Sequence, residues 1–328
     1  RFEEPLGGLG PRATPSIAGD KVVALGAEGW LRCLEAATGK ELWQIDLRKE
    51  ANCAIPMWGF SCSPFCTEDI AIVHSGASGD KGIMAFRLKN GELAWSAAAG
   101  KMSYGSLQSV PLLGQDWIGL LSEKGAEFFD PADGTSTFLY EWPHSGYRAL
   151  QPQMVAKDQF LVPTGQGTGT QLVRIQKNGD NYEGEEVWTN WRFRPDYNDV
   201  FVHQDNIYGF DGQIFASIRL EDGKQNWKGG RYGKGQAVLL ADSNAILVLS
   251  EEGEMILLSA TPEDHVELYK QKVLPSRTWN HPVIVGDRLY VRDAEEAACY
   301  ALPVAAMPNT PDESEAPEPE AGAGEPSN

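Results

Sequence analysis

The sequence contains few cysteines, and no two of them are adjacent. Five cysteines in 328 residues are too few for a disulfide framework. Cys62 and Cys66 are spaced Cys-x-x-x-Cys, but Pro64 lies between them and neither a second pair nor a nearby histidine completes a zinc set. We expect both to be small buried strand residues and predict no metal site.

Sequence motifs of catalysis are also missing. The five histidines show neither His-x-x-x-His nor His-Glu-x-x-His spacing, and no Gly-x-Ser-x-Gly turn marks a serine hydrolase. No run of about 18 apolar residues could span a bilayer. The sequence therefore gives no positive indication of an enzyme and predicts no transmembrane segment.

Positive charge is scarce. The formal net charge of −18 argues against nucleic-acid binding, which needs lysines and arginines to displace counterions. Six of the acidic residues fall between Pro308 and Asn328, without a basic residue among them. We predict a propeller domain over residues 1–303 and a disordered acidic Pro/Gly/Ala-rich tail over residues 304–328. The tail either keeps the protein soluble or tethers a partner.

A glycine followed four residues later by a large apolar residue recurs along the chain. The intervals between successive copies are 41 to 52 residues, which is the length of a β-propeller blade. The large ring is expected to cover the gap to the next blade and to keep its N–H in water. The copies are Gly39/Trp43, Gly91/Trp95, Gly134/Phe138, a stretched Gly179/Trp188, Gly223/Trp227 and a degenerate Asp264/Leu268.

Each repeat divides into four short strands with turns between them. In the first repeat we expect strands over residues 13–17, 22–25, 31–34 and 42–45. Seven repeats are visible, and the last stops after its third strand. We predict an all-β propeller of four-stranded blades: either a seven-bladed ring whose missing outer strand comes from residues 1–4, or a truncated eight-bladed ring with a further blade upstream.

Residues 37–43 (Ala-Thr-Gly-Lys-Glu-Leu-Trp) and 221–227 (Glu-Asp-Gly-Lys-Gln-Asn-Trp) resemble the PQQ-like β-propeller repeat, as do the strand openings at 13–20 and 280–287. The resemblance covers residues 12–302. It is closest to bacterial PQQ-like proteins related to the propeller lipoprotein of the outer-membrane β-barrel assembly machinery, including a group without assigned activity. It implies a periplasmic or secreted protein whose signal peptide is not present in the given chain.

Related quinoprotein dehydrogenases hold their quinone with calcium, an aspartate base and, in many, a disulfide between adjacent cysteines. This chain has no Cys-Cys pair, and only Arg12 and Arg148 lie near first-strand positions to meet the carboxylates of a quinone. We therefore predict no cofactor, PQQ included. The resemblance favours a non-catalytic interaction or assembly scaffold with a protein or peptide partner.

The residues just before the innermost strands should converge on the mouth of the central channel. They mix flat aromatic rings with hydrogen-bonding groups, which suits a pocket for a polar ligand or peptide; alternatively they satisfy one another and ordered water. A rival function is a small-ligand binder or enzyme that uses Asp199, His281, Arg12 and Arg148. The predicted ligand-binding residues are Arg12, Trp58, Tyr104, Arg148, Tyr197, Asn198, Asp199, Gln236, Trp279, Asn280 and His281.

Overall fold

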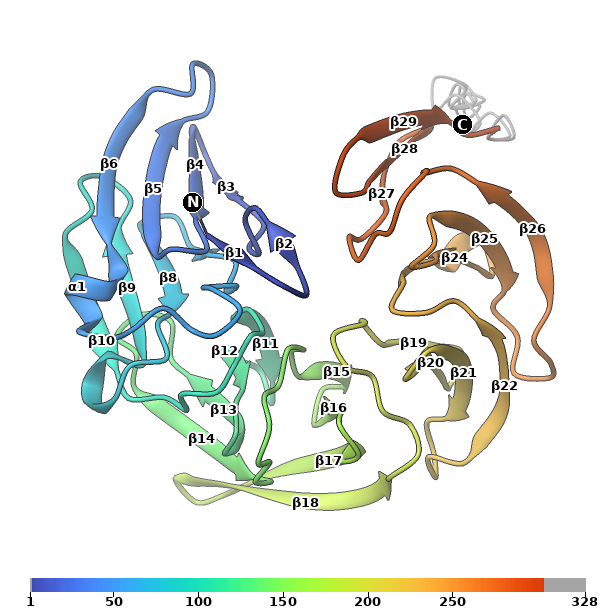
Figure 1. Ribbon diagram of the computed structural model, residues 1–328. Helices are drawn as coiled ribbons and strands as arrows, with labels where there is room; N and C mark the ends of the chain where they lie inside the picture. The colour runs from blue at the N-terminus through green and yellow to red at the C-terminus, as the bar shows by residue number, and fades with distance from the viewer. Residues whose placement is uncertain (1, 304–328) are drawn as a thin grey trace, which may run out of the picture.

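The computed structural model describes residues 2–303, which form a two-stranded hairpin and seven larger antiparallel sheets, the blades, arranged around a ring (Figure 1). Within each sheet the strands are neighbours in chain order, so every blade is a simple meander. Six sheets have four strands, and the seventh has three within the described residues. The predicted fold class, a seven-repeat β-propeller, is confirmed. The predicted tail, residues 304–328, lies outside the described residues.

The first four blades are each built from four strands. Blade 1 comprises β3 (Ser16–Ala18), β4 (Lys21–Leu25), β5 (Trp30–Glu35) and β6 (Glu41–Asp46). Blade 2 comprises β7 (Phe65–Cys66), β8 (Ile70–His74), β9 (Ile83–Arg87) and β10 (Leu93–Ala97). Blade 3 comprises β11 (Gln108–Leu112), β12 (Gln115–Leu121), β13 (Gly125–Phe129) and β14 (Ser136–Glu141). Blade 4 comprises β15 (Gln153–Ala156), β16 (Gln159–Thr164), β17 (Gly169–Asn178) and β18 (Asn181–Asn190).

The remaining blades follow the same order from the axis outward. Blade 5 comprises β19 (Phe201–His203), β20 (Asn206–Asp211), β21 (Ile214–Arg219) and β22 (Gln225–Arg231). Blade 6 comprises β23 (Gln236–Leu240), β24 (Ala245–Leu249), β25 (Glu254–Ser259) and β26 (Glu267–Lys272). Blade 7 comprises β27 (Val283–Val285), β28 (Arg288–Arg292) and β29 (Ala297–Ala301).

The core lies between the faces of adjacent blades. The second and third strands of inner blades are buried on both faces, as in β8 and β13, where every residue is buried. One cluster joins Val23 and Leu31 of blade 1 to Val73 and Phe86 of blade 2, and similar clusters fill the later interfaces. Burial on both faces explains why these strands read as continuous apolar runs rather than alternating ones.

The repeated glycine and tryptophan meet across blade boundaries. At three blade boundaries the indole of the outer strand covers the turn glycine of the next blade. A Cβ added at Gly91 would lie 3.0 Å from the ring of Trp43, and one at Gly223 would lie 2.6 Å from the ring of Trp188. Gly134 is covered by Trp95 in the same way. The recurring glycine and tryptophan therefore pack adjacent blades against each other, as the spacing predicts.

The prediction that the indole N–H groups stay in water is wrong: Nε1 of Trp95 is buried, and the other three tryptophans of the motif donate to backbone carbonyls. Nε1 of Trp43 donates to the carbonyl of Leu88 at 3.0 Å, Nε1 of Trp188 to Leu220 at 2.8 Å, and Nε1 of Trp227 to Thr261 at 2.8 Å. The carbonyls belong to the turn that the ring covers, so packing and hydrogen bonding hold the same two blades together.

Strand register also corrects the last copy of the motif. In blades 1 and 5 the tryptophan follows a one-residue bulge in the outer strand. In blade 6 the bulge falls at Leu268, and Tyr269 pairs with Leu257. Tyr269, not Leu268, therefore occupies the tryptophan position.

The amino-terminal residues do not complete blade 7. Glu3–Glu4 (β1) pairs with Gly8–Leu9 (β2) in a separate two-stranded hairpin, because the Glu4 side chain accepts hydrogen bonds from the backbone N–H groups of Leu6 and Gly7 and stabilises a local turn. The hairpin is linked to blade 7 by a hydrogen bond from Arg277 to the carbonyl of Leu6 at 3.0 Å. The prediction that residues 1–4 supply the outer strand of blade 7 is therefore wrong.

Short helices occur only in loops of the described chain: α1 (Leu47–Ala51), capped by the carboxylate of Asp46, and the 3-10 turns η1 (Gly79–Lys81) and η2 (Ala241–Ser243). Within residues 2–303, no helix has the length and apolar character needed to cross a bilayer.

Candidate functional site

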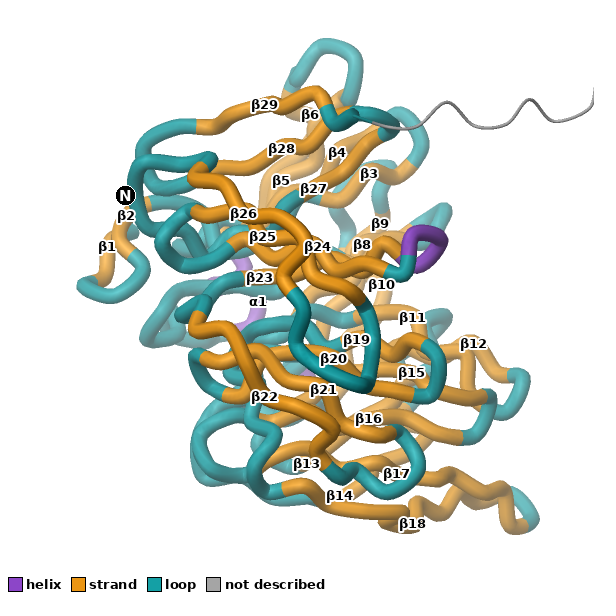
Figure 2. The backbone as a smooth tube through the Cα atoms, turned by 90° about the vertical axis from the view of Figure 1, so that its right-hand side faces the viewer, coloured by secondary structure: helices purple, strands orange, loops and turns teal. Residues whose placement is uncertain are grey.

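One face of the propeller carries the loops that lead into the innermost strands. Because each blade is a meander, these loops and the loops between second and third strands lie at the same end of the ring. Figure 2 shows the ring from the side, with the β1–β2 hairpin projecting from one face. We call the face that carries these loops the inlet face. All the predicted ligand-binding residues belong to segments leading into or opening the innermost strands.

Three aromatic rings from successive inlet loops contact one another. The ring centroid of Trp58 lies 5.0 Å from that of Tyr104 and 4.6 Å from that of Tyr147, and the two tyrosines are 5.5 Å apart. The planes are tilted or perpendicular, which favours edge-to-face attraction. Trp58 and Tyr104 were predicted from the sequence, whereas Tyr147 was missed. Its signal was the recurrence of an aromatic residue in the inlet loops.

A second aromatic pair continues the row. Tyr197 and Trp279 have centroids 5.7 Å apart, and the guanidinium carbon of Arg277 lies 4.4 Å from the Trp279 ring. Nε1 of Trp279 donates to the Glu251 carboxylate at 2.8 Å. Burial raises the pKa of Tyr197, and the charges of Glu251 and Tyr147 raise it further, so its phenol stays neutral at physiological pH.

Two buried amides tie inlet loops together. Gln236 donates through Nε2 to the carbonyls of Tyr197 at 3.0 Å and Trp279 at 3.5 Å, and Asn198 donates to the carbonyl of Gly235. Their amide oxygens, Oε1 of Gln236 and Oδ1 of Asn198, are buried without a hydrogen-bond partner among the described residues. Each oxygen can accept a hydrogen bond from a donor that reaches it.

Asp199 and His281 form an exposed pair beside the amides. Nε2 of His281 lies 2.8 Å from the Asp199 carboxylate, and both side chains are about half exposed. Asn280 instead faces its own loop, where its side chain donates to Thr278 at 3.4 Å. The structure thus brings Asp199 and His281 together although 82 residues separate them.

The two predicted arginines both bind groups of the chain itself. Arg12 binds the amino-terminal hairpin through the carbonyls of Gly8 and Gly10 and the Glu4 carboxylate. Arg148 is 1% exposed. Burial lowers the pKa of Arg148 to about 10, so it remains charged at neutral pH.

The buried Arg148 guanidinium joins three segments of blades 3 and 4. It donates to Thr164 Oγ1 at 3.0 Å, to the carbonyl of Trp142 at 2.6 Å and to the carbonyl of Ser122. Because these groups use its donors, the guanidinium does not join Asp199 and His281 in one open site.

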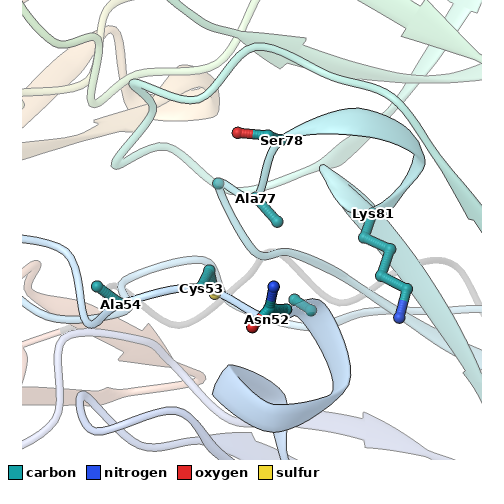
Figure 3. A pocket seen from close by; sticks show the side chains of 8 residues that line it. Asn52, Cys53, Ala54, Ala77, Ser78 and Lys81 are labelled. Carbon is teal, nitrogen blue, oxygen red and sulfur yellow. The ribbon is translucent and has the colours of Figure 1, made fainter.

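A pocket of about 600 Å³ also opens on the inlet face, between α1 and the loop of η1 (Figure 3). It is lined by Asn52, Cys53 and Ala54 on one side and by Ala77, Ser78 and Lys81 on the other. Lys81 Nζ donates to the carbonyl of Glu50 at 2.6 Å. Burial raises the pKa of the Cys53 thiol, which leaves it protonated and weakly nucleophilic.

The two arginines chosen from the sequence are not free to meet the carboxylates of a quinone, because Arg148 is enclosed by its own loops and Arg12 binds the hairpin. The absence of PQQ stays a prediction. The five cysteines are free. Within residues 2–303, no group of three or more histidine, cysteine or acidic side chains is arranged to hold a metal ion.

Comparison with known proteins agrees with this architecture. The profile of the family described as outer membrane protein assembly factor BamB matches residues 3–229. The BamB protein of Shewanella oneidensis is 22% identical over 303 residues, covering 87% of this chain and 72% of the relative.

Solved structures show the same fold at low identity. The crystal structure of BamB from Moraxella catarrhalis superposes with a TM-score of 0.60 at 14% identity, covering 88% of this chain and 81% of that one. The WD40 repeats of RRP9 give a TM-score of 0.53 at 10% identity, with 83% of each chain covered. The profile match spans more than half of the sequence, and the chain therefore belongs to the family of the outer membrane protein assembly factor BamB.

Proposed function

We propose that this propeller is a non-catalytic scaffold that binds a protein partner through its inlet face, in the bacterial envelope. The observation that carries the proposal is the row of five aromatic side chains from five inlet loops, Trp58, Tyr104, Tyr147, Tyr197 and Trp279. Large rings of this kind dominate the energetics of protein interfaces.

Further apolar side chains are exposed on the same face. Met57 is 76% exposed and Trp191 is 59% exposed, and both lie in inlet loops, as does the exposed Met102. Grouped exposed apolar residues mark interaction surfaces more often than scattered ones. Family membership supports an assembly role, since the related proteins are described as outer membrane protein assembly factors.

Site-specific photocrosslinking in the native bacterium tests this proposal. A photoreactive residue at Met57 or Trp191 should give crosslinks to envelope proteins. The same residue at Gln115, which is exposed at the opposite end of blade 3, should give none. Equal crosslinking from both faces, or recovery of the protein in the cytoplasm alone, would contradict the proposal.

A second candidate is a small ligand rich in hydrogen-bond donors, favoured by the unpartnered oxygens of Asn198 and Gln236 beside Asp199 and His281. The role as a scaffold requires no PQQ. Turnover of alcohols or sugars by the purified protein with added PQQ and calcium would replace the scaffold proposal with an enzymatic one.

A further inference from the structure

A groove lies at the end of the ring opposite the inlet face. This end carries the turns between first and second strands and between third and fourth strands of each blade, and we call it the outlet face. The groove has a volume of about 1010 Å³ and runs between blades 1 and 2, both of which lie wholly within the described residues (Figure 1). A segment bound there would contact two neighbouring blades at once.

Apolar side chains line part of the groove. Leu88 packs in the core between the two blades, and its carbonyl accepts a hydrogen bond from the indole N–H of Trp43 at 3.0 Å. Leu42, which is 44% exposed, lines the same groove. Ala18 and Cys66 line it on the first strands, nearer the ring axis. The groove therefore offers an apolar surface to an occupant.

Carboxylates outnumber cations along the groove. Asp20 is paired with Lys21 at 2.5 Å, but Glu68 and Asp69 are exposed and form no ion pair within residues 2–303. The unpaired carboxylates and the net charge of −2 favour a cationic occupant. The charged residues that line the groove are Asp20, Glu35, Glu68, Asp69, Lys21 and Lys89.

Backbone hydrogen bonds fix the turns that carry these acids. In blade 1 the N–H of Ala36 donates to the carbonyl of Asp20 at 2.8 Å, and in blade 2 the N–H of Leu88 donates to the carbonyl of Asp69 at 2.8 Å. The hydroxyl of Thr67 accepts a further hydrogen bond from the N–H of Asp69 at 3.3 Å. Because the chain itself holds these turns, binding would require little ordering of the groove.

The chemistry of the lining selects one kind of occupant. Lysine and arginine side chains combine an apolar stem with a charged head, so a stem over Leu42 can bring its cation to the carboxylates of the β7–β8 turn. The chain's own residues 308–328 include six acids and no base, and a second copy of the chain carries the same net charge of −18. Like charge disfavours both, so the complementary occupant is a basic segment of another protein.

We propose that the groove between blades 1 and 2 binds a basic, extended segment of a partner protein through its lysine or arginine side chains. The carboxylates of Glu68 and Asp69 bind the cationic heads, and Leu42 contacts the aliphatic stems. The inference rests on the proposed role as a protein scaffold but assigns a surface distinct from the inlet face. One propeller can then hold two proteins at opposite ends of its ring.

Peptide binding to the full chain, measured by fluorescence anisotropy, tests the proposal. A short labelled peptide of alternating lysine and leucine should bind, and the same peptide with glutamate in place of lysine should not. Glu68→Gln combined with Asp69→Asn should weaken binding about fivefold or more, and added salt should weaken it as well. The control Glu221→Gln combined with Asp242→Asn changes the net charge equally on the outlet turns of blades 5 and 6 and should leave binding unchanged.

The apolar part of the groove has a test of its own. Leu42→Ala should weaken binding of the lysine peptide about threefold, because the stems lose apolar contact area. Leu139→Ala removes a leucine that is 36% exposed on the outer strand of blade 3 and should leave binding unchanged. Thermal unfolding should confirm that every variant is folded.

Three results would overturn the proposal. The first is no binding of the lysine peptide. The second is equal loss of affinity in the groove and control double variants, because affinity would then follow net charge alone. The third is unchanged affinity of Leu42→Ala, because the peptide would then bind the acidic turns without entering the groove. Crosslinking from Met57 reports on the inlet face, and Gln115 lies on blade 3 outside the groove, so either proposal can fail without the other.

Discussion

The indole of Trp43 lies directly over Gly91 of the next blade, and a Cβ at Gly91 would come within 3.0 Å of the ring. Gly91 also has a φ of +76°, which an L-residue adopts only with strain. Two independent constraints therefore select glycine at this turn.

Substitution of Gly91 separates these constraints when compared with Gly39. Gly39 has a similar φ of +70°, but a Cβ added there would meet no heavy atom within 4 Å. Gly39→Ala should cost about 1 kcal/mol from backbone strain alone, whereas Gly91→Ala should cost a further 1 to 3 kcal/mol, roughly, from overpacking. Urea unfolding measures the loss of stability of both variants, provided that the m-value stays the same. Equal losses would show that the covering indole adds nothing.

Replacing tryptophan by phenylalanine tests the hydrogen bonds between blades. Trp227 donates to Thr261 at 2.8 Å, whereas the buried Nε1 of Trp95 has no partner among the described residues. Trp227→Phe should therefore destabilise the protein by about 1 kcal/mol more than Trp95→Phe. The free energy of unfolding of each variant gives the difference, and a difference near zero would contradict the role of the N–H.

Arg148 should be a stability residue. Arg148→Met leaves the carbonyls of Ser122 and Trp142 buried without their charged donor, so we expect a loss of about 3 kcal/mol. The matched change Arg192→Met removes an exposed arginine and should cost less than about 0.5 kcal/mol. If Arg148→Met keeps full stability and instead removes partner binding, Arg148 belongs to the interface.

His74 should make stability depend on pH. It is buried, donates through Nε2 to the carbonyl of Gly100 at 2.8 Å, and burial lowers its pKa below 6.5 despite the nearby charges of Glu127 and Glu123. As the pH falls below about 6.5 the unfolded chain therefore binds a proton first, and the free energy of unfolding decreases. His74→Gln should flatten this decrease relative to the wild type. An identical pH profile would contradict the argument.

The sequence predicts the blades better than it predicts how the ring ends. Repeats such as Gly39/Trp43 indicate turns and the packing of one ring on the next blade, and these depend on few residues. The number of blades and most of the strands could therefore be predicted from the sequence. Closure by residues 1–4 could not be judged from the sequence, because Glu4 satisfies its own turn and draws that segment into a hairpin.

The convergence of the inlet segments was predicted, but the contacts of individual side chains were not, and ligand binding by these residues stays a prediction. Trp58 contacts Tyr104 across two of these segments. Arg148 was chosen over its neighbour Tyr147 for its charge, yet the loops of blades 3 and 4 enclose the arginine and leave the tyrosine in the aromatic row. The burial of Arg148 depends on segments that are far apart in the chain, so no local sequence pattern predicts it.

The turns at Gly91, Gly134 and Gly223 are each covered by the preceding blade, which gives the ring a direction. Blades 2 to 6 are each supported by two neighbours, whereas the turn of Gly39 in blade 1 is bare and the open face of blade 7 exposes Val285. In a repeat array governed by nearest-neighbour contacts, end units fray before inner ones. Within residues 2–303, we therefore expect hydrogen exchange to be faster in blades 1 and 7 than in the five blades between them, so that local opening should begin on either side of the same boundary.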